Sequence, residues 1–311
     1  MNIQDNPIIR FLIRNFVDGV YCIGYRFNDT DFWEENVSKF KVFKPTLKYW
    51  YADPIPFVYN NKYYVFMERF NRFKRIGDIV VSALNNKNKL SVPRAVITKD
   101  THLSYPMVIS YKGNYYMLPE TSATKSIDIY IMKDSPYQWE EYYSIRLNEE
   151  IVDVSYVIDD HGILLLAGVL DSENPIFVKR QIIKINDLDN VQKLNYKISY
   201  TDKEGALNKR NGGAFLKKGK GLYRVVQEST IEMYGLAITL NKVHELSDEN
   251  IDEECIIRKD VKNIDIDLKK LFYKKTGVHT YGACIGGFEV IDMSVAKLSL
   301  VPLINHLMYR G

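Results

Sequence analysis

Residues 51–70 read YADPIPFVYNNKYYVFMERF, and this stretch sets the pattern for most of the chain. Two apolar and aromatic runs flank the pair Asn60-Asn61, which is the turn chemistry of a tight β-hairpin. The hairpin begins on Asp53 and ends on Glu68. Because antiparallel strands return to the side from which they start, we expect both carboxylates to lie at one end of this hairpin.

The same hairpin recurs along the chain, and a further strand pattern follows most copies. The later copies read SYPMVISYKGNYYMLPET, VDVSYVIDDHGILLLAGV, GGAFLKKGKGLYRVVQES and HTYGACIGGFEVIDM. With a period of about 50 to 65 residues, the units start near Asp53, Ser104, Asp153, Gly212 and His279. Repeats of four-stranded units near this length are typical of β-propellers.

The sequence therefore predicts an all-β fold, a five-bladed β-propeller that forms a single domain over residues 1–311. We expect the early strand at residues 20–27 to close the ring by joining the last blade. Residues 1–18 form an N-terminal extension with helical spacing, whose apolar side chains share one face. This segment is expected to pack on the body of the protein, and the alternative is a contact with a membrane surface or a biosynthetic complex.

Composition narrows the possible functions. The 311 residues are 46% hydrophobic and 26% charged, and the net charge of +3 gives no case for a nucleic-acid partner. Cys22, Cys255 and Cys284 are too few and too widely spaced for a disulfide framework or a zinc site. Arg10 and Arg14 interrupt the apolar run near the N-terminus, so we expect no secretory signal and a cytoplasmic location.

A propeller brings polar residues of all five units together. The first strand of each blade lines the central channel, so residues that enter these strands converge at one mouth. In this sequence they are Asp53, then His102 with Ser104 and Tyr105, then Asp153, then Arg210 with Asn211, and finally His279 with Thr280. The ends of the second strands return to the same mouth and carry Glu68, Glu120 and Gln227.

Several motifs also resemble those of one known family. They are ADP…YY, HLSYP…YMLPET, VDVS, KRNGGAF…LYRVVQE…YGLAI and HTYG…FEVID. Over residues 20–295 the chain resembles the bacterial domain family related to the N-terminal region of glucosamine inositolphosphorylceramide transferases. This resemblance implies a five-bladed propeller, more distantly similar to glycosidases of the arabinanase and β-xylosidase type. It also implies a role in surface-polysaccharide biosynthesis.

The distant resemblance implies roles for three carboxyl groups. The propeller glycosidases use a base on the first blade, an aspartate that tunes a pKa, and a glutamate acid. By position, Asp53 matches the base and Asp153 matches the tuning aspartate. The Glu-Gly-Pro-like context of the acid is missing from this sequence, so Glu68, Glu120 and Glu228 all stay open as the acid. The missing context departs from the pattern of a hydrolase.

The catalytic candidates are thus Asp53, Glu68, Glu120 and Asp153. Glycosyl hydrolysis needs an acid and a base or nucleophile about 5 Å or 6.5–9.5 Å apart, which carboxyl groups facing across a channel mouth can provide. Each candidate also has an ordinary interpretation. Asp53 would start a turn, Glu68 would pair with Arg69 or Arg72, and Glu120 would be a loop carboxylate.

The substrate-binding candidates are His102, Ser104, Tyr105, Arg210, Gln227 and His279. The two histidines could instead be buried and hold strand starts, or hold a channel ion with Asp53. Arg210, with Arg224 and Gln227 nearby, could bind an acidic sugar or a sugar phosphate, and the alternative is a salt bridge between blades. Tyr105 and Trp50 could stack on a sugar or pack in the core. No ligand spacing indicates a metal, so we predict no metal and no cofactor.

We therefore expect a carbohydrate-active protein that transfers or hydrolyses glycosyl groups in surface-polysaccharide or glycoconjugate biosynthesis. Its partner would be a carbohydrate or a sugar nucleotide, bound at one mouth of the channel. The alternative function is a non-catalytic module that binds a glycan or a sugar nucleotide beside a separate transferase. A third possibility is a scaffold whose channel residues are purely structural, because a fold does not decide a function.

Overall fold

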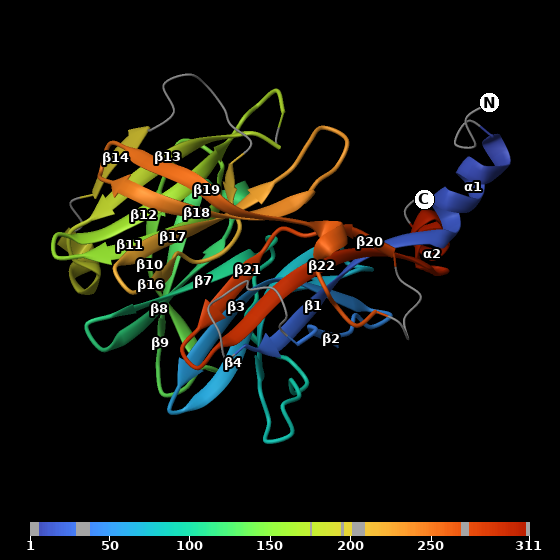
Figure 1. The fold of residues 1–311 in the computed structure, drawn as a ribbon, viewed down its shortest axis with the longest axis horizontal. Coiled ribbons are helices and arrows are strands. Elements are labelled where there is room, and N and C mark those ends of the chain that lie inside the picture. Colours follow the sequence, from blue (N-terminus) through green and yellow to red (C-terminus); the bar gives the residue numbers. More distant parts are fainter. Residues whose placement is uncertain are drawn as a thin grey trace.

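The computed structural model describes residues 6–28, 38–174, 176–193, 196–200, 209–268 and 274–308. Its strands form five small antiparallel sheets, which are the blades of a β-propeller (Figure 1). The predicted all-β, five-bladed fold is confirmed. The aromatic and β-branched runs of the sequence form the strands, and the Asn, Asp and Gly residues between them form the turns.

Four blades follow one another in chain order. Blade 1 contains β3 (Tyr49–Tyr59), β4 (Lys62–Asn71), β5 (Ile76–Ala83) and β6 (Arg94–Ile97). Blade 2 contains β7 (Ser104–Tyr111), β8 (Asn114–Glu120), β9 (Ser126–Met132) and β10 (Trp139–Arg146). Blade 3 contains β11 (Ile151–Asp159), β12 (Gly162–Leu170), β13 (Val178–Ile185) and β14 (Tyr196–Tyr200). Blade 4 contains β15 (Arg210–Asn211), β16 (Leu216–Lys218), β17 (Gly221–Glu228), β18 (Ala237–Leu246) and β19 (Ile251–Asp260).

Blade 5 joins the two ends of the chain. It contains β20 (Lys274–Gly277), β21 (Tyr281–Cys284) and β22 (Phe288–Leu298), together with β1 (Val17–Phe27) and β2 (Lys41–Phe43). β1 pairs antiparallel with β22 along its whole length, so the predicted closure of the ring by residues 20–27 is confirmed. Three short 3₁₀ helices complete the described connections: η2 (Ser122–Thr124), η3 (Leu188–Lys193) and η4 (Val261–Asn263).

The core consists of apolar layers between neighbouring blades. Between blades 1 and 2, for example, Phe57 and Phe66 pack in one cluster with Met107 and Met117. Equivalent clusters lie between the other pairs, including blades 5 and 1, where Ile23 and Val290 meet residues of β3, β4 and β5. Each fully buried apolar side chain stabilises the fold by about 1.5–3 kcal/mol. The ring is therefore held by contact between faces of sheets, and every blade needs two neighbours.

Two helices extend from the ring at the same place. α1 (Pro7–Phe16) lies in the N-terminal segment for which helical spacing was predicted, and the Asn6 side chain caps it by accepting from the backbone N–H of Ile8 at 2.9 Å. α2 (Val301–Met308) follows β22 and packs against α1 (Figure 1). Both described helices are too short to cross a membrane. Since β1 and β22 are paired, their helices necessarily emerge side by side.

Gly213 lies where blades 4 and 5 approach each other closely, so its substitution tests that contact. Gly213 has φ +146°, and a Cβ at this position would lie 2.1 Å from the carbonyl oxygen of Tyr281. We expect Gly213→Ala to lower the free energy of unfolding by about 3 kcal/mol, since backbone strain and overpacking add. Chemical denaturation measures this loss.

Gly113→Ala is the matched control for this variant. Gly113 also has positive φ, +85°, but a Cβ there meets nothing within 4 Å. Its substitution should cost about 1–2 kcal/mol from backbone strain alone. Equal losses for the two variants would show that the approach of Gly213 to blade 5 is not tight.

Candidate functional site

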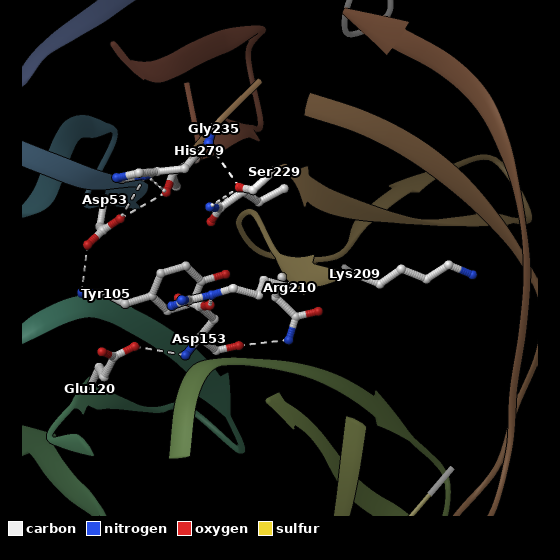
Figure 2. A network of polar contacts seen from close by, with 12 residues as sticks. Asp53, Tyr105, Glu120, Asp153, Lys209, Arg210, Ser229, Gly235 and His279 are labelled. Carbon is white, nitrogen blue, oxygen red and sulfur yellow. Dashed lines mark hydrogen bonds and ion pairs between the residues drawn. The ribbon is translucent and has the colours of Figure 1, made fainter. Parts of the chain in front are cut away.

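The candidate site is built on a backbone distortion that three inner strands share. β3, β7 and β11 each carry a bulge in the ladder to the next strand, and Asp53, Tyr105 and Asp153 occupy these bulges. Their φ angles are 51°, 44° and 50°, a left-handed conformation that is uncommon for residues other than glycine. Such strain costs about 1–3 kcal/mol per residue and persists only where other contacts hold it. The polar network of Figure 2 supplies these contacts.

In two places a carboxylate from the second strand of one blade holds the bulge of the next blade. Asp292, on β22 of blade 5, accepts a hydrogen bond from the backbone N–H of Asp53 in blade 1 at 3.1 Å. Glu120, on β8 of blade 2, accepts one from the backbone N–H of Asp153 in blade 3 at 2.9 Å (Figure 2). Each contact joins two blades and satisfies the N–H of a strained residue.

Glu68, on β4 of blade 1, occupies the same ladder position as Glu120 but does not hold the next bulge. Both glutamates lie opposite the residue that directly precedes the bulge of their own inner strand. The N–H of Tyr105, the bulge residue of blade 2, donates instead to Oδ2 of Asp53 at 3.2 Å. Oε1 of Glu68 is consequently buried without a hydrogen-bond partner in the described part of the chain.

The surroundings of Glu68 favour its neutral form. Burial is the main cause that raises its pKa well above the usual range, and the carboxyl groups of Asp53 and Glu120 add to it. Nε2 of His102 lies 3.5 Å from Oε1, which is longer than a normal hydrogen bond. Nδ1 of His102 accepts from the backbone N–H of Gly77 at 3.0 Å, so the ring proton lies on Nε2, toward Glu68.

Residues of blade 5 hold Asp53 in its ionised form, in contrast to Glu68. Its Oδ1 accepts from the Thr280 hydroxyl at 2.9 Å and lies 3.3 Å from Nδ1 of His279. The same Nδ1 lies 2.5 Å from Oδ2 of Asp292, whose Oδ1 accepts from the backbone N–H groups of His279 and Thr280 at 3.0 Å each. These four side chains form one buried cluster at the seam between blades 5 and 1.

The charges in this cluster follow from its geometry. Burial alone would lower the pKa of His279, but the carboxylates of Asp292 and Asp53 raise it to about 9, so the imidazole is protonated at neutral pH. Burial raises the pKa of Asp53 to about 6, while His279 opposes that shift. Around pH 7 the pair is therefore an imidazolium and a carboxylate. Asp53 and Glu68 lie on the two strands at the open end of one hairpin, and they differ in protonation state.

A second ion pair joins blades 3 and 4. Nε of Arg210 donates to Oδ2 of Asp153 at 2.5 Å, and Asn211 Nδ2 donates to the backbone carbonyl of Asp153 at 2.7 Å. The inter-blade salt bridge considered for Arg210 is thus present. Beside it, burial and the Asp153 carboxylate raise the pKa of Glu120 to about 8, against the opposing effect of Arg210. Glu120 is accordingly a second carboxyl group that is mostly neutral at pH 7.

The Tyr105 side chain extends from blade 2 to blades 3 and 4. Its ring is 2% exposed, and its hydroxyl contacts Ser155 Oγ at 3.2 Å in blade 3. The same hydroxyl oxygen accepts from the backbone N–H of Gly213 in blade 4 at 2.7 Å and lies 3.1 Å from the Gly213 carbonyl oxygen. Tyr105 was expected either to stack on a sugar or to pack in the core. Its ring is covered by protein, so it packs in the core.

Two other predicted binding residues are buried beside the network. Gln227 Nε2 donates to the hydroxyl of Ser229 at 3.1 Å, and that hydroxyl oxygen accepts from the backbone N–H of Gly235 at 2.9 Å. Ser104 is buried directly before the bulge of β7. Lys209 points away from the network (Figure 2).

Aromatic rings surround the two histidines. Tyr21 lies over His279 with ring centroids 4.7 Å apart, and Tyr234 meets the same imidazole at 5.7 Å. Phe70 contacts His102 edge to face at 5.9 Å. These rings exclude water from one side of the network, which strengthens its electrostatic interactions.

The structure places all ten predicted site residues in or beside this network, and it separates other residues from it. Glu228, which was open as the acid, pairs with Arg258 at 2.8 Å on the outer part of blade 4. Arg224 is buried and pairs with Glu253, and it joins the network only through Asn211, to whose Oδ1 it donates at 2.8 Å. The partners considered for Glu68 are engaged elsewhere, because Arg69 pairs with Asp78 and Arg72 with Asp18.

The sequence did not identify three residues of the site, which are Asp292, Tyr21 and Tyr234. A signal for Asp292 was present, since FEVID ends the second strand of the last unit on a carboxylate as FMERF and YMLPET do in the first two. Tyr21 lies on the closing strand and Tyr234 in the connection between β17 and β18. Neither position is marked by the repeat, so no pattern pointed to them.

Among the described residues, the cluster at the seam between blades 5 and 1 also has the spacing of possible metal ligands. Asp53, His279 and Asp292 each offer one ligand atom, and these atoms lie within 4.8 Å of one another. The 2.5 Å contact between His279 and Asp292 is an ion-pair distance, and the imidazolium supplies the positive charge that the two carboxylates require. A cation would have to displace that proton before it could bind here.

Comparison with known proteins identifies relatives of most of the chain. Residues 44–266 match the family model described as "Glucosamine inositolphosphorylceramide transferase 1, N-terminal". A protein of that name from Arabidopsis thaliana is 29% identical over 209 residues, which cover 65% of this chain and 26% of the relative. Its counterpart from Oryza sativa subsp. indica is 27% identical over 214 residues, with 65% and 27% covered. The chain thus spans about a quarter of the length of these curated relatives.

Solved structures share the fold. An exo-1,5-α-L-arabinanase from a bovine ruminal metagenomic library superposes with a TM-score of 0.53 at 14% identity, covering 82% of this chain and 94% of the other. A β-xylosidase/α-arabinofuranosidase from a compost metagenome gives a TM-score of 0.52 at 13% identity, covering 82% and 92%. At such low identity these likenesses establish the fold alone.

The raised pKa values predict a dependence of stability on pH. Glu120 keeps its proton up to about pH 8 in the folded protein but loses it near its usual value of 4.5 when unfolded, so stability falls as pH rises between these values. The contribution of His279 is complete below pH 6.5 and is lost as pH rises through about 9. Glu120→Gln mimics the neutral acid, so its melting temperature should match wild type near pH 5 and exceed it at pH 9.

Glu228→Gln is the matched control, because Glu228 also ends a second strand but pairs with Arg258 at the surface. Its melting temperature should stay at a constant offset from wild type across the same pH range. Thermal unfolding between pH 5 and 9 measures both variants. Parallel curves for Glu120→Gln and wild type would contradict the assignment of a neutral carboxyl group at Glu120.

Proposed function

We propose a function from one premise: this chain belongs to the family of the glucosamine inositolphosphorylceramide transferase 1 N-terminal domain. The resemblance inferred from the sequence motifs is thereby confirmed. The proposed function is catalysis on glycosyl groups, by transfer or hydrolysis, at the channel mouth that holds Asp53 and Glu68. Family membership and the shared fold of propeller glycosidases both support a carbohydrate-active protein.

One observation carries the catalytic part of the proposal. Of the two equivalent glutamates, Glu120 is used to hold the neighbouring bulge, whereas Oε1 of Glu68 is left unpaired and Glu68 is kept neutral. Asp53 has taken over the structural bond that Glu68 would otherwise make. A buried neutral carboxyl group close to an ionised one is the arrangement that separates an acid from a base in glycosyl chemistry.

The roles follow from the protonation states. Glu68 donates its proton to the glycosidic or leaving-group oxygen as that bond to the anomeric carbon breaks. The carboxylate of Asp53 takes the proton from the incoming hydroxyl of water or of an acceptor sugar, which forms the new bond. The Nε2–H of His102, 3.5 Å from Glu68, then faces the glutamate anion until solvent restores the proton.

A second candidate function is a binding module without its own catalysis. This chain spans about a quarter of the length of its curated relatives, so the activity in their name can reside in the remainder of those proteins. That fact favours a binding module. The engagement of Asp153 by Arg210 also favours it, since that carboxylate then serves the structure. In this function the same mouth would bind a carbohydrate or sugar nucleotide for a separate transferase in glycoconjugate assembly.

Turnover measurements distinguish the two functions. The protein is incubated with a panel of sugar nucleotides, acceptor glycans and oligosaccharides, and products are detected by mass spectrometry. We expect Glu68→Gln and Asp53→Asn to lower turnover by about 10²- to 10⁴-fold, the usual effect of removing an acid or base. Glu228→Gln and Asp252→Asn change surface carboxylates and should keep wild-type rates.

Each outcome of this experiment supports one function. Turnover that survives in both Glu68→Gln and Asp53→Asn would show that the catalytic assignment is wrong. Binding of a sugar ligand by wild type, with no turnover of any member of the panel, would favour the binding module. Melting temperatures of the variants verify that they are folded.

We also propose that the N-terminal helix contacts a membrane surface. The side chains of Ile8 and Phe11 are 67% and 58% exposed on α1, and Leu307 on the adjoining α2 is 72% exposed. Arg10 and Arg14 stand on the same helix. An amphipathic helix with exposed apolar side chains and flanking arginines is suited to the interface of an anionic bilayer.

Vesicle sedimentation tests this contact. The double variant Ile8→Ser, Phe11→Ser should lose about tenfold or more of its binding to vesicles that contain phosphatidylglycerol, since each apolar side chain adds affinity through its buried area. Ile285→Ser is the control, because this side chain is 87% exposed in the β21–β22 turn. Equal binding of the double variant and wild type would contradict the membrane contact and leave a protein partner as the occupant of α1.

A further inference from the structure

A cavity of ≈ 590 Å³ lies between blade 1 and the two terminal helices. α1 contributes Arg14, the turn between β4 and β5 contributes Arg72 and Arg75, and α2 contributes Asn305 and His306. We call this cavity the basic pocket. Its volume is in the range of small-molecule sites, which are typically about 300–1,000 Å³.

The wall of the basic pocket has an excess of positive charge. Three arginines line it against one carboxylate, Asp18. Asp18 is already paired with Arg72, whose guanidinium also donates to the backbone carbonyl of Leu47 at 2.9 Å. Arg72 is thus fixed and neutralised by the fold. The charges of Arg14 and Arg75 meet no carboxylate among the residues that the structure describes.

The position of Arg14 is set by a neighbour from the other helix. Its Nη2 lies 2.8 Å from Nε2 of His306, and since a guanidinium can only donate, His306 accepts through this nitrogen. The contact aligns a cation on α1 with the pocket wall formed by α2. It also shows that the pocket requires both termini of the chain to be in place.

A second feature of the wall concerns hydrogen bonding. Nδ2 of Asn305 donates to the backbone carbonyl of Arg72 at 3.3 Å. The Oδ1 atom of the same side chain is buried and has no hydrogen-bond partner within the described ranges. An unsatisfied buried acceptor costs about 1–3 kcal/mol, so the fold accepts a loss of stability at this wall of the pocket.

The floor of the pocket connects it to the candidate site. Trp50 and Phe70 line it and are stacked with ring centroids 4.4 Å apart. Trp50 contacts Tyr21 at 5.3 Å, and Tyr21 lies over His279. On the other side, Phe70 contacts His102. A single layer of rings thus separates the pocket from the two histidines that accompany Asp53 and Glu68.

We propose that the basic pocket binds the phosphate of a phosphorylated sugar or polyol, the phosphate ester through which the glycosyl substrate or its acceptor is carried. This inference rests on the proposed function, and it adds the chemical class of the ligand. Arg14 and Arg75 pair with the phosphate, for which the planar fork of arginine is well suited. An apolar face of the ligand packs on Trp50, which lines the pocket.

The test measures binding alone, in the full chain made silent by Asp53→Asn and Glu68→Gln. The probes are UDP-glucose, glucose 1-phosphate and vesicles that contain phosphatidylinositol, with glucose and phosphatidylcholine vesicles as neutral controls. Isothermal titration calorimetry and vesicle sedimentation read the affinities. Binding of a soluble probe identifies a sugar phosphate as the source, and binding of the vesicles alone identifies a lipid headgroup.

Removing the two arginines should weaken the phosphate-bearing probe selectively. We expect Arg14→Gln and Arg75→Gln each to reduce its affinity about tenfold, the usual effect of losing a charge-assisted hydrogen bond. Arg75→Lys keeps the charge and should lose less. Arg94→Gln removes an exposed arginine of β6 and should leave the affinity unchanged.

Two results would overturn the inference: no phosphate probe bound by the silent protein, or binding unaffected by both glutamine variants. Neither result bears on turnover at Asp53 and Glu68, which the panel of substrates tests in the wild-type protein. Conversely, loss of turnover in Glu68→Gln with no effect of Arg75→Gln on binding would keep the proposed catalysis and reject the pocket. Melting temperatures of the variants confirm folding in each case.

Discussion

The antiparallel ladder between β1 and β22 is the constraint on which the rest of the structure depends. It joins residues from the two ends of the chain, from Val17 opposite Leu298 to Phe27 opposite Phe288. Because the ladder closes the ring, blade 5 packs on blade 1 and Asp292 reaches the N–H of Asp53. The same ladder sets α1 beside α2, which forms the basic pocket. Both the candidate site and the pocket therefore depend on one long-range pairing, whose loop-closure entropy the interblade contacts must offset.

The balance of charge at the mouth decides which groups are protonated. Five carboxyl groups meet there, namely those of Asp53, Glu68, Glu120, Asp153 and Asp292; Glu120 is half-buried and the other four are buried. The cations that face them are the half-buried Arg210 and the buried, protonated His279. Five negative charges against two positive ones would be strongly unfavourable so far from water. The aspartates contact the cations directly, so the proton stays on the two glutamates, which have no ion pair with either cation. The unequal protonation that the proposed catalysis needs is thus a consequence of the fold.

Much of this architecture could be predicted from the sequence because the repeat marks it. Turn pairs such as Asn60-Asn61 fix the inner hairpins, and the register of those hairpins brings Asp53 and Glu68 to one end. The outer strands, by contrast, differ in length and sequence from blade to blade, from RAVI in β6 to IDEECIIRKD in β19, so the repeat does not mark their positions. The roles within the site depended on contacts between blades. No periodicity reveals that Asp53, and not Glu68, accepts from the N–H of Tyr105.

The layer of aromatic rings explains how an acidic mouth and a basic pocket can be neighbours. A phosphate placed directly against Asp53 and Asp292 would be repelled, and the unpaired arginines would be drawn to those carboxylates and neutralised. Tyr21, Trp50 and Phe70 stand between the two and keep the opposite charges apart at low polarity. The carboxylates of the mouth and the arginines of the pocket therefore keep their charges without neutralising one another.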